Sequence, residues 1–148
     1  MSNIRTENEM TYTTAMTKEQ KLIFLKTLVA LAKADTKIDE NEKDFLKGMS
    51  LVFNLPQEDI DIKHIPSEDE VVDMVKVIKD RKLAMNLIKE MCMLANFDGD
   101  MSDEEIVLIG RVGEAMGLSV DKIQDISQWV IDRIVLQERG KIIFEQFN

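Results

Sequence analysis

Residues 21–60 of this chain recur, without a gap, as residues 84–123. Seven of the forty aligned positions are identical, where chance gives about two or three. The identical pairs are Lys26/Lys89, Leu31/Leu94, Ala32/Ala95, Asp35/Asp98, Glu42/Glu105, Leu55/Leu118 and Ile60/Ile123. Such a unit packs against its own copy to share one core. The sequence therefore predicts two tandem pseudo-symmetric repeats, 18–80 and 81–143.

The composition predicts one all-α domain. With 148 residues, only two prolines and six glycines, long stretches are free of helix breakers. A net charge of −9 argues against nucleic-acid partners and anionic membrane surfaces. The single cysteine, Cys92, cannot form an internal disulfide, which agrees with a cytoplasmic location. No run approaches the roughly 20 apolar residues of a membrane span, so no direct membrane insertion is expected.

Capping signals and apolar spacing predict about seven helices in a single bundle. Ser, Thr or Asp is followed three residues later by Glu or Gln at Thr17, Asp39, Ser67 and Ser102, and each pair is a capping box. Gly117 is a natural residue to follow a helix end. The first repeat is expected to hold helices at 18–34, 39–54, 56–62 and 68–79, and the second at 81–97, 102–116 and 119–144, with a weak point at Gly140. Residues 1–16 are predicted to be a disordered lead-in to the domain 17–148.

Each repeat carries a cluster of acidic residues between its first two helices. The first cluster is Asp35, Asp39, Glu40 and Glu42, and the second is Asp98, Asp100, Asp103, Glu104 and Glu105. Caps and turns alone can account for these acids, since carboxylates in a first helical turn accept amide protons and complement the helix dipole. The functional alternative is a cation site with oxygen ligands, which suits Ca²⁺, Mg²⁺ or Mn²⁺.

The EF-hand pattern does not fit these turns. In the second copy, Asp103 stands where the turn glycine belongs and Ile109 stands at the twelfth position in place of a bidentate Glu. In the first copy, Lys37 occupies a ligand position. Any cation site must therefore be assembled differently, with ligands from one turn or from both copies.

The pattern Leu-Ala-x-x-Asp-x-x-Ile/Met-x-x-x-Glu, present at residues 31–42 and again at 94–105, resembles the TerB-like family (tellurite resistance protein B and relatives). The resemblance covers about residues 18–143. It implies an all-α pseudo-symmetric fold, a cytoplasmic role in bacterial stress response beside membrane-bound partners, and acidic residues that bind divalent cations. By position, the implied ligands are Asp35, Glu42, Asp98 and Glu105. The second turn keeps the family's Asp-Gly, whereas the first reads Asp35-Thr36-Lys37, so the second is the better candidate.

The remaining chemistry-bearing residues are expected to be structural. His64 lies beside Pro66 in a predicted linker, Cys92 occupies a helical core position, and neither can be built into a catalytic arrangement with any specificity. Ten methionines favour core filling, with a Met-rich groove for a partner helix as the alternative. Trp129 is expected in the core or as an edge anchor.

The predicted function is a small cytoplasmic stress-response or tellurite-resistance-like binding module that coordinates a divalent cation, Ca²⁺ or Mg²⁺, through its acidic turns. A protein partner, as part of a membrane-associated complex, is expected. The alternative is a metal-independent protein-interaction domain that uses an acidic face or an apolar groove. An enzyme with paired carboxylates is not expected, because these acids look solvated and catalysis calls for perturbed groups in a cleft.

Overall fold

The computed structural model describes residues 12–34, 40–55, 65–96 and 101–145 of the chain. These residues contain helices and no strand, which confirms the all-α class. The helices are η1 (Tyr12–Ala15), α2 (Lys18–Lys33), α3 (Glu40–Val52), α4 (Glu68–Met74), η3 (Val75–Val77), α5 (Arg81–Ala95), α6 (Asp103–Ala115) and α7 (Val120–Glu145), where η marks a 3-10 helix.

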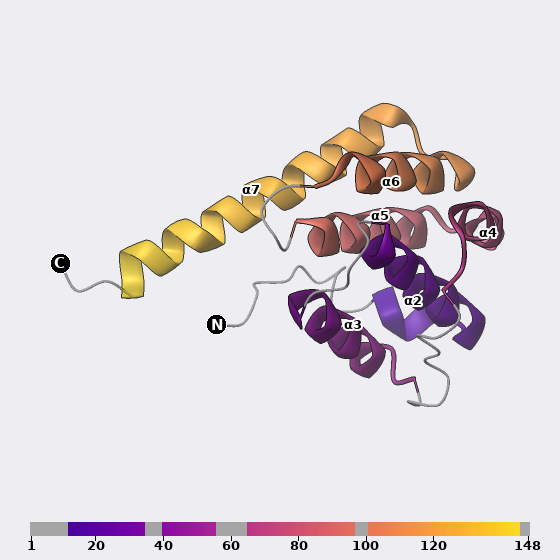
Figure 1. Cartoon of the computed structure of the whole chain (residues 1–148), viewed down its shortest axis with the longest axis horizontal. Helices are drawn as coiled ribbons and strands as arrows, with labels where there is room; N and C mark the ends of the chain where they lie inside the picture. Colours follow the sequence, from indigo (N-terminus) through magenta and orange to yellow (C-terminus); the bar gives the residue numbers. More distant parts are fainter. Residues whose placement is uncertain (1–11, 35–39, 56–64, 97–100, 146–148) are drawn as a thin grey trace.

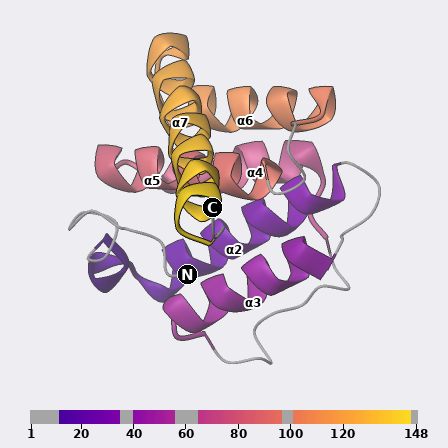
Figure 2. The same ribbon diagram turned by 90° about the vertical axis from the view of Figure 1, so that its left-hand side faces the viewer.

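Helices α2 and α5 pack against each other at the centre of the molecule (Figures 1 and 2). On the outer side of α2 lies α3, and on the outer side of α5 lies α6. The short helix α4 contacts both α2 and α6, while the long helix α7 runs over α5 and α6. The core is therefore a stack of two helical hairpins, α2–α3 and α5–α6.

Three of the four predicted capping boxes are present, and the fourth, at Asp39, lies outside the described residues. Thr17, Ser67 and Ser102 each accept a hydrogen bond from the backbone of the third residue onward, whose Gln or Glu side chain accepts in return from the cap backbone. Two single caps complete the set. Asp80 accepts from two backbone amides at the start of α5, and Ser119 accepts from the amide of Lys122 at the start of α7.

Helices α3 and α6 also end alike, with a residue in the left-handed region. Asn54 has φ +54° and Gly117 has φ +83°. In each case the amide of the next residue, Leu55 or Leu118, donates to the carbonyl five positions earlier, at 3.0 and 2.9 Å. This is the Schellman arrangement, which satisfies carbonyls that the helix leaves unpaired. Gly117 was predicted as such a position, and Asn54 was not.

The helix boundaries themselves recur with the spacing of the sequence repeat. Helix α3 spans 40–52 and helix α6 spans 103–115, so that both ends of α3 align with the ends of α6 when 21–60 is laid on 84–123. Helices α2 and α5 begin at Lys18 and Arg81, which keep the same spacing, after the caps Thr17 and Asp80. The local geometry that defines these hairpins is thus repeated along the chain.

Three details differ from the sequence-based expectations. The expected helix over 68–79 is an α-helix only to Met74 and continues as the 3-10 helix η3, while the expected helix over 56–62 lies outside the described residues. Helix α7 runs through Gly140 without a break. Among the described residues there are six α-helices, so the expected count of about seven is not confirmed.

The expected disordered lead-in needs correction at residues 12–16. Tyr12 starts a 3-10 helix and is buried, and Met16 is buried as well. The ring of Tyr12 stacks on Phe24 of α2, with the centroids 6.2 Å apart. Phe24 in turn meets Phe53 edge to face at 5.8 Å. Aromatic contacts of this kind stabilise the packing of the segment on the core.

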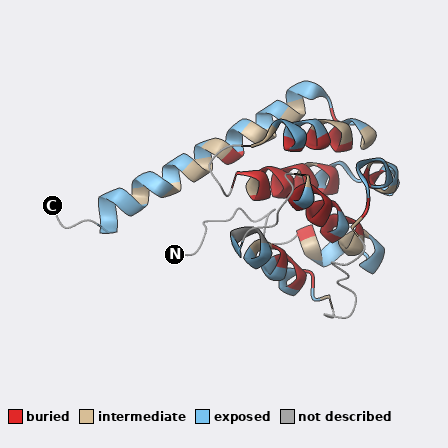
Figure 3. Ribbon diagram, viewed as in Figure 1, coloured by how far each residue is buried: buried red, intermediate tan, exposed pale blue. Residues whose placement is uncertain are grey.

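Burial is concentrated in α2 and α5, as Figure 3 shows. Phe24 and Leu28 of α2, and Leu87 and Met91 of α5, have no exposed surface. None of the helices in the described ranges combines the length and the apolar character that crossing a bilayer requires.

Candidate functional site

The structure describes one of the four predicted cation ligands in full. Asp35 and Asp98 lie outside the described residues. Glu42 lies in α3, but its side chain is also outside the description. Glu105 belongs to the first turn of α6 and can be judged directly.

Glu105 is a buried capping residue. The residue is 4% exposed, and its Oε1 accepts a hydrogen bond from the backbone N–H of Ser102 at 2.9 Å. Its own N–H donates to Ser102 Oγ at 3.2 Å. The carboxylate therefore already holds the start of α6, as the capping interpretation predicts. Within the described ranges, no group of three or more His, Cys, Asp or Glu side chains is close enough to hold a metal ion.

A pocket of about 520 Å³ lies where the C-terminal end of α2 meets the N-terminal ends of α4 and α6. Its walls are mainly apolar, and acidic side chains stand among them. The apolar lining comes from Ala30, Ala34, Ile65, Pro66, Val107 and Leu108, and the charged lining from Lys33, Glu68, Asp103 and Glu104. Three elements distant in sequence thus build one concave surface.

The charges at this pocket are unevenly neutralised. Arg111 of α6 forms ion pairs with Glu68 at 3.2 Å and with Asp69 at 2.9 Å. Hydrogen bonds to Asp69 and Glu68 raise the pKa of the Arg111 guanidinium above its usual value. Asp103 and Glu104 are exposed in the first turn of α6. The α6 side of the pocket is consequently acidic, which favours a cationic ligand.

The pocket touches the edges of both acidic segments. Ala34 is the last described residue before the segment that carries Asp35, and Asp103 follows closely on the segment that carries Asp98. Asp103 and Glu104 belong to the second acidic cluster recognised in the sequence. Lys33, Glu68 and Val107 were not singled out, and only the approach of α2 and α4 to α6 could have identified them.

A second polar cluster is buried between η1 and α5. Lys89 Nζ lies 3.0 Å from Glu90 Oε1, and both side chains are buried. The hydroxyl of Tyr12 donates to the same oxygen at 3.3 Å, and the ammonium of Lys89 lies 4.9 Å from the centroid of the Tyr12 ring. Glu90 Oε2 is buried with no hydrogen-bond partner among the described residues. No sequence pattern indicated this cluster, because its members come from distant segments.

The other single residues behave as structural groups. Cys92 is fully buried, and burial raises the pKa of its thiol to about 11, an effect that a hydrogen bond with Ser127 reduces in part. Met91 is buried, and Met74, Met85 and Met116 pack against the core, as predicted. Trp129 is 42% exposed and lies at the edge of the fold, with the guanidinium of Arg133 5.2 Å from its ring centroid. His64 lies outside the described residues.

Comparison with known proteins adds nothing to this geometry: no protein-family model, no curated protein and no solved structure matches the chain. The TerB-like resemblance therefore stays a prediction from the sequence.

Proposed function

We propose that this chain is a small binding module whose pocket between α2, α4 and α6 takes a short protein segment with apolar and basic side chains. The observation that carries the proposal is the composition of the pocket, in which apolar walls adjoin the exposed acids Asp103 and Glu104. A volume of about 520 Å³ is in the range of ordinary ligand sites and holds a few side chains.

Apolar contacts and charge would contribute differently to binding in this pocket. Burying apolar groups against Ala30, Val107 and Leu108 supplies affinity. The exposed carboxylates, on a chain of net charge −9, attract a basic segment and set its orientation. The proposal assigns the pocket a binding role and no catalytic step.

A divalent cation is the second candidate ligand. It is favoured by the position of the pocket, whose lining residues Ala34 and Asp103 adjoin in sequence the two acidic segments. The proposed ligands are Asp98 and Glu105, with Asp35 and Glu42 from the first copy, and the ion is Ca²⁺ or Mg²⁺. This interpretation accords with the TerB-like resemblance and with its implied cytoplasmic stress-response role beside a membrane-associated complex.

We further propose that the two halves, 18–80 and 81–143, arose by duplication. The recurrence of helix boundaries at the spacing of the sequence repeat supports this origin. The two C-terminal motifs support it as well, because Asn54 and Gly117 occupy aligned positions and both adopt positive φ. Copies that diverged under a shared core would keep such backbone features while their surfaces changed.

The peptide proposal can be tested with two neighbouring residues of α6. Val107 lines the pocket and is 55% exposed, whereas Ile106 is 50% exposed and does not line it. The probe is an acetylated, amidated peptide of sequence Leu-Lys-Lys-Leu-Arg-Leu, titrated into the labelled protein. We expect amide NMR shifts at Ala30 and Leu108, their loss in Val107→Asn, which removes apolar lining without adding charge, and their retention in Ile106→Asn. Absence of shifts up to about 1 mM peptide, the weak limit of specific binding, would overturn the proposal.

The cation proposal is tested on the same sample with Ca²⁺ and Mg²⁺ at roughly 1–5 mM, the range of weak oxygen sites. Glu105→Gln is the informative variant, because Gln can keep the capping hydrogen bond to Ser102 while the ligand charge is lost. We expect it to lose cation-induced shifts without a large loss of stability. Unchanged amide shifts and an unchanged melting temperature in the unmodified protein would remove the cation and leave the peptide proposal standing.

A further inference from the structure

The C-terminal half of α7 carries apolar side chains that no other part of the described structure covers. Core contacts of this helix come from Ile123, Ile126, Val130 and Ile134, and they end there. Beyond Ile134 the helix continues to Glu145, away from the bundle (Figures 1 and 3). At 1.5 Å per residue this extension is roughly 16 Å long.

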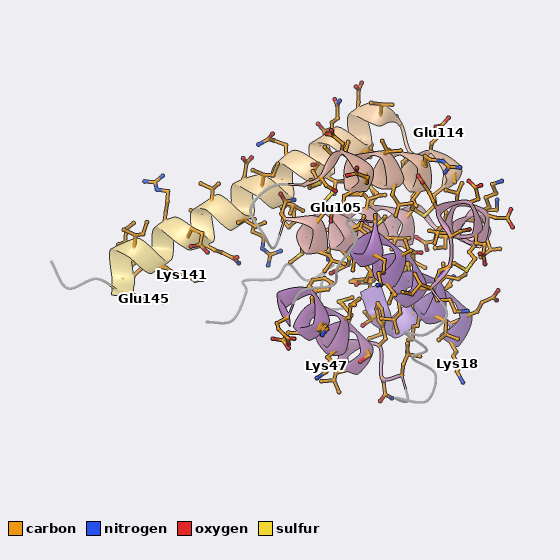
Figure 4. All side chains as sticks on the ribbon, viewed as in Figure 1. Lys18, Lys47, Glu105, Glu114, Lys141 and Glu145 are labelled. Carbon is orange, nitrogen blue, oxygen red and sulfur yellow. The ribbon has the colours of Figure 1, made fainter. Side chains whose placement is uncertain are left out.

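The exposed residues of the extension are large. Val135, Leu136, Ile142, Ile143 and Phe144 are 53%, 68%, 58%, 61% and 83% exposed. These residues do not all lie on the helix face that carries the core contacts of Ile123, Ile126, Val130 and Ile134. The extension therefore has apolar side chains on several sides. Exposed apolar side chains gathered in one segment are typical of an interaction surface. In Figure 4, Lys141 and Glu145 are labelled on the same projecting end.

We propose that this extension pairs antiparallel with the extension of a second copy of the chain. Residues 130–145 contain three acids and three bases, Asp132, Glu138, Glu145, Arg133, Arg139 and Lys141, and are therefore neutral, although the whole chain carries −9. Two such acidic molecules repel each other over most of their surfaces, and a locally neutral segment is the place where they can meet.

The order of the charges is self-complementary under a two-fold axis. If the axis passes between Val135 and Leu136, Asp132 faces Arg139 of the second copy, because residues seven apart lie on the same face of an α-helix. The same register brings Trp129 close to Ile143 of the second copy, because residues fourteen apart also share a helix face. Apolar groups then meet apolar groups and opposite charges meet, as an isologous interface requires. Asp132 already accepts a hydrogen bond from Gln128 at 2.9 Å and remains exposed, so it is available at this surface.

The available area fits a modest dimer. The five exposed residues and Trp129 present on the order of 600 Å² of apolar surface, given the size of such side chains. Two copies would cover at most on the order of 1,200 Å², because the side chains lie on several sides of the helix, and this limit is the lower end for a specific interface. We therefore expect a dimer that dissociates in the micromolar range. This surface is distinct from the pocket between α2, α4 and α6, so the inference does not depend on the proposed function.

The test is sedimentation velocity of the full chain from about 1 μM to 1 mM, a range that brackets the expected dissociation constant. We expect a concentration-dependent dimer. Leu136→Glu should weaken it by at least about 100-fold, as burying an unpaired charge at an interface centre does. Leu51→Glu is the matched control, because Leu51 is 79% exposed on α3, away from the interface.

A charge exchange identifies the second copy as the occupant. Asp132→Arg or Arg139→Asp places like charges opposite each other and should weaken the dimer roughly tenfold. The double variant restores opposite charges and should restore the dimer, which no unrelated partner would produce. A monomer at all concentrations, a dimer that survives Leu136→Glu, or binding of the monomer to phosphatidylglycerol vesicles through this segment would each overturn the proposal.

Discussion

Helices α5 and α7 differ in which side chains they bury: α5 buries charged as well as apolar residues, whereas α7 leaves large apolar residues exposed. The fifteen residues of α5 include eleven buried ones, among them the charged residues Lys89 and Glu90. The 26 residues of α7 include one buried residue, Val130, while Leu136 and Phe144 lie exposed. Position in the fold, rather than polarity of the residue, decides burial at these sites. The charged groups of α5 are tolerated because they pair with each other, and the apolar groups of α7 remain available to a partner.

Two lysines at aligned positions of the repeat also show that position in the fold decides burial. Lys26 of α2 and Lys89 of α5 stand at equivalent positions of the sequence repeat. Lys26 is exposed, whereas Lys89 is buried beside Glu90 and beneath the ring of Tyr12. The η1 segment that carries Tyr12 packs on α5, and this contact separates the environments of the two lysines.

The largest effect is expected from breaking the buried ion pair. Glu90→Ala should lower the free energy of unfolding by about 3–5 kcal/mol, because it removes the carboxylate partner of Lys89 at a buried site. Urea denaturation followed by circular dichroism measures this loss. Lys26→Ala is the surface control, with an expected change within about 0.5 kcal/mol. The double variant Lys89→Met/Glu90→Met should recover most of the loss, and a change below about 1 kcal/mol in Glu90→Ala would contradict the expected burial cost.

Two leucines compare the helices directly. Leu87 of α5 is fully buried, and Leu87→Ala should cost about 2–5 kcal/mol through lost contacts and a residual cavity. Leu136 of α7 is 68% exposed, and Leu136→Ala should change stability by less than about 0.5 kcal/mol in dilute protein. Thermal unfolding followed by tryptophan fluorescence, at a protein concentration well below the expected dissociation constant of the dimer, separates the two. Equal losses would mean that the α7 extension is covered within a single chain.

The smallest contrast is expected at the helix starts. Asp80→Ala at α5 and Ser119→Ala at α7 should each cost about 0.5–2 kcal/mol, because a cap satisfies amides of its own helix whether that helix is buried or not. Asp80 should cost more, since it accepts from both Lys82 and Leu83 amides. Chemical denaturation of the two variants checks this order. A negligible cost at Ser119 alone would show that the start of α7 is held by packing instead.

Much of the fold was predictable because its determinants are local. Capping boxes at Thr17, Ser67 and Ser102 placed three helix starts correctly, since each acts within a single turn. Gly117 indicated the end of α6 through its freedom to adopt positive φ. Asn54 adopts the same conformation but was not predicted to do so. Asn occupies the left-handed region less often than Gly, so an Asn is a weaker indicator of a helix end.

The candidate site was predictable only in part. The capping role of Glu105 could be inferred from its spacing to Ser102, and the structure confirms it. Asp103 and Glu104 were recognised as acids, but their place beside the apolar Ala30 and Leu108 depends on how α2 meets α6. No local pattern encodes that meeting, because the two helices lie in different halves of the chain.

By itself, the sequence determined the helical class, the caps and the regular spacing of the repeat, all of which follow from interactions within a turn or along one helix face. Only the tertiary structure decided that Tyr12 packs on α5, that Lys89 is buried while Lys26 is not, and that the end of α7 is left uncovered. The reason is that burial depends on what other segments bring to a position, and a residue's own polarity does not specify its neighbours.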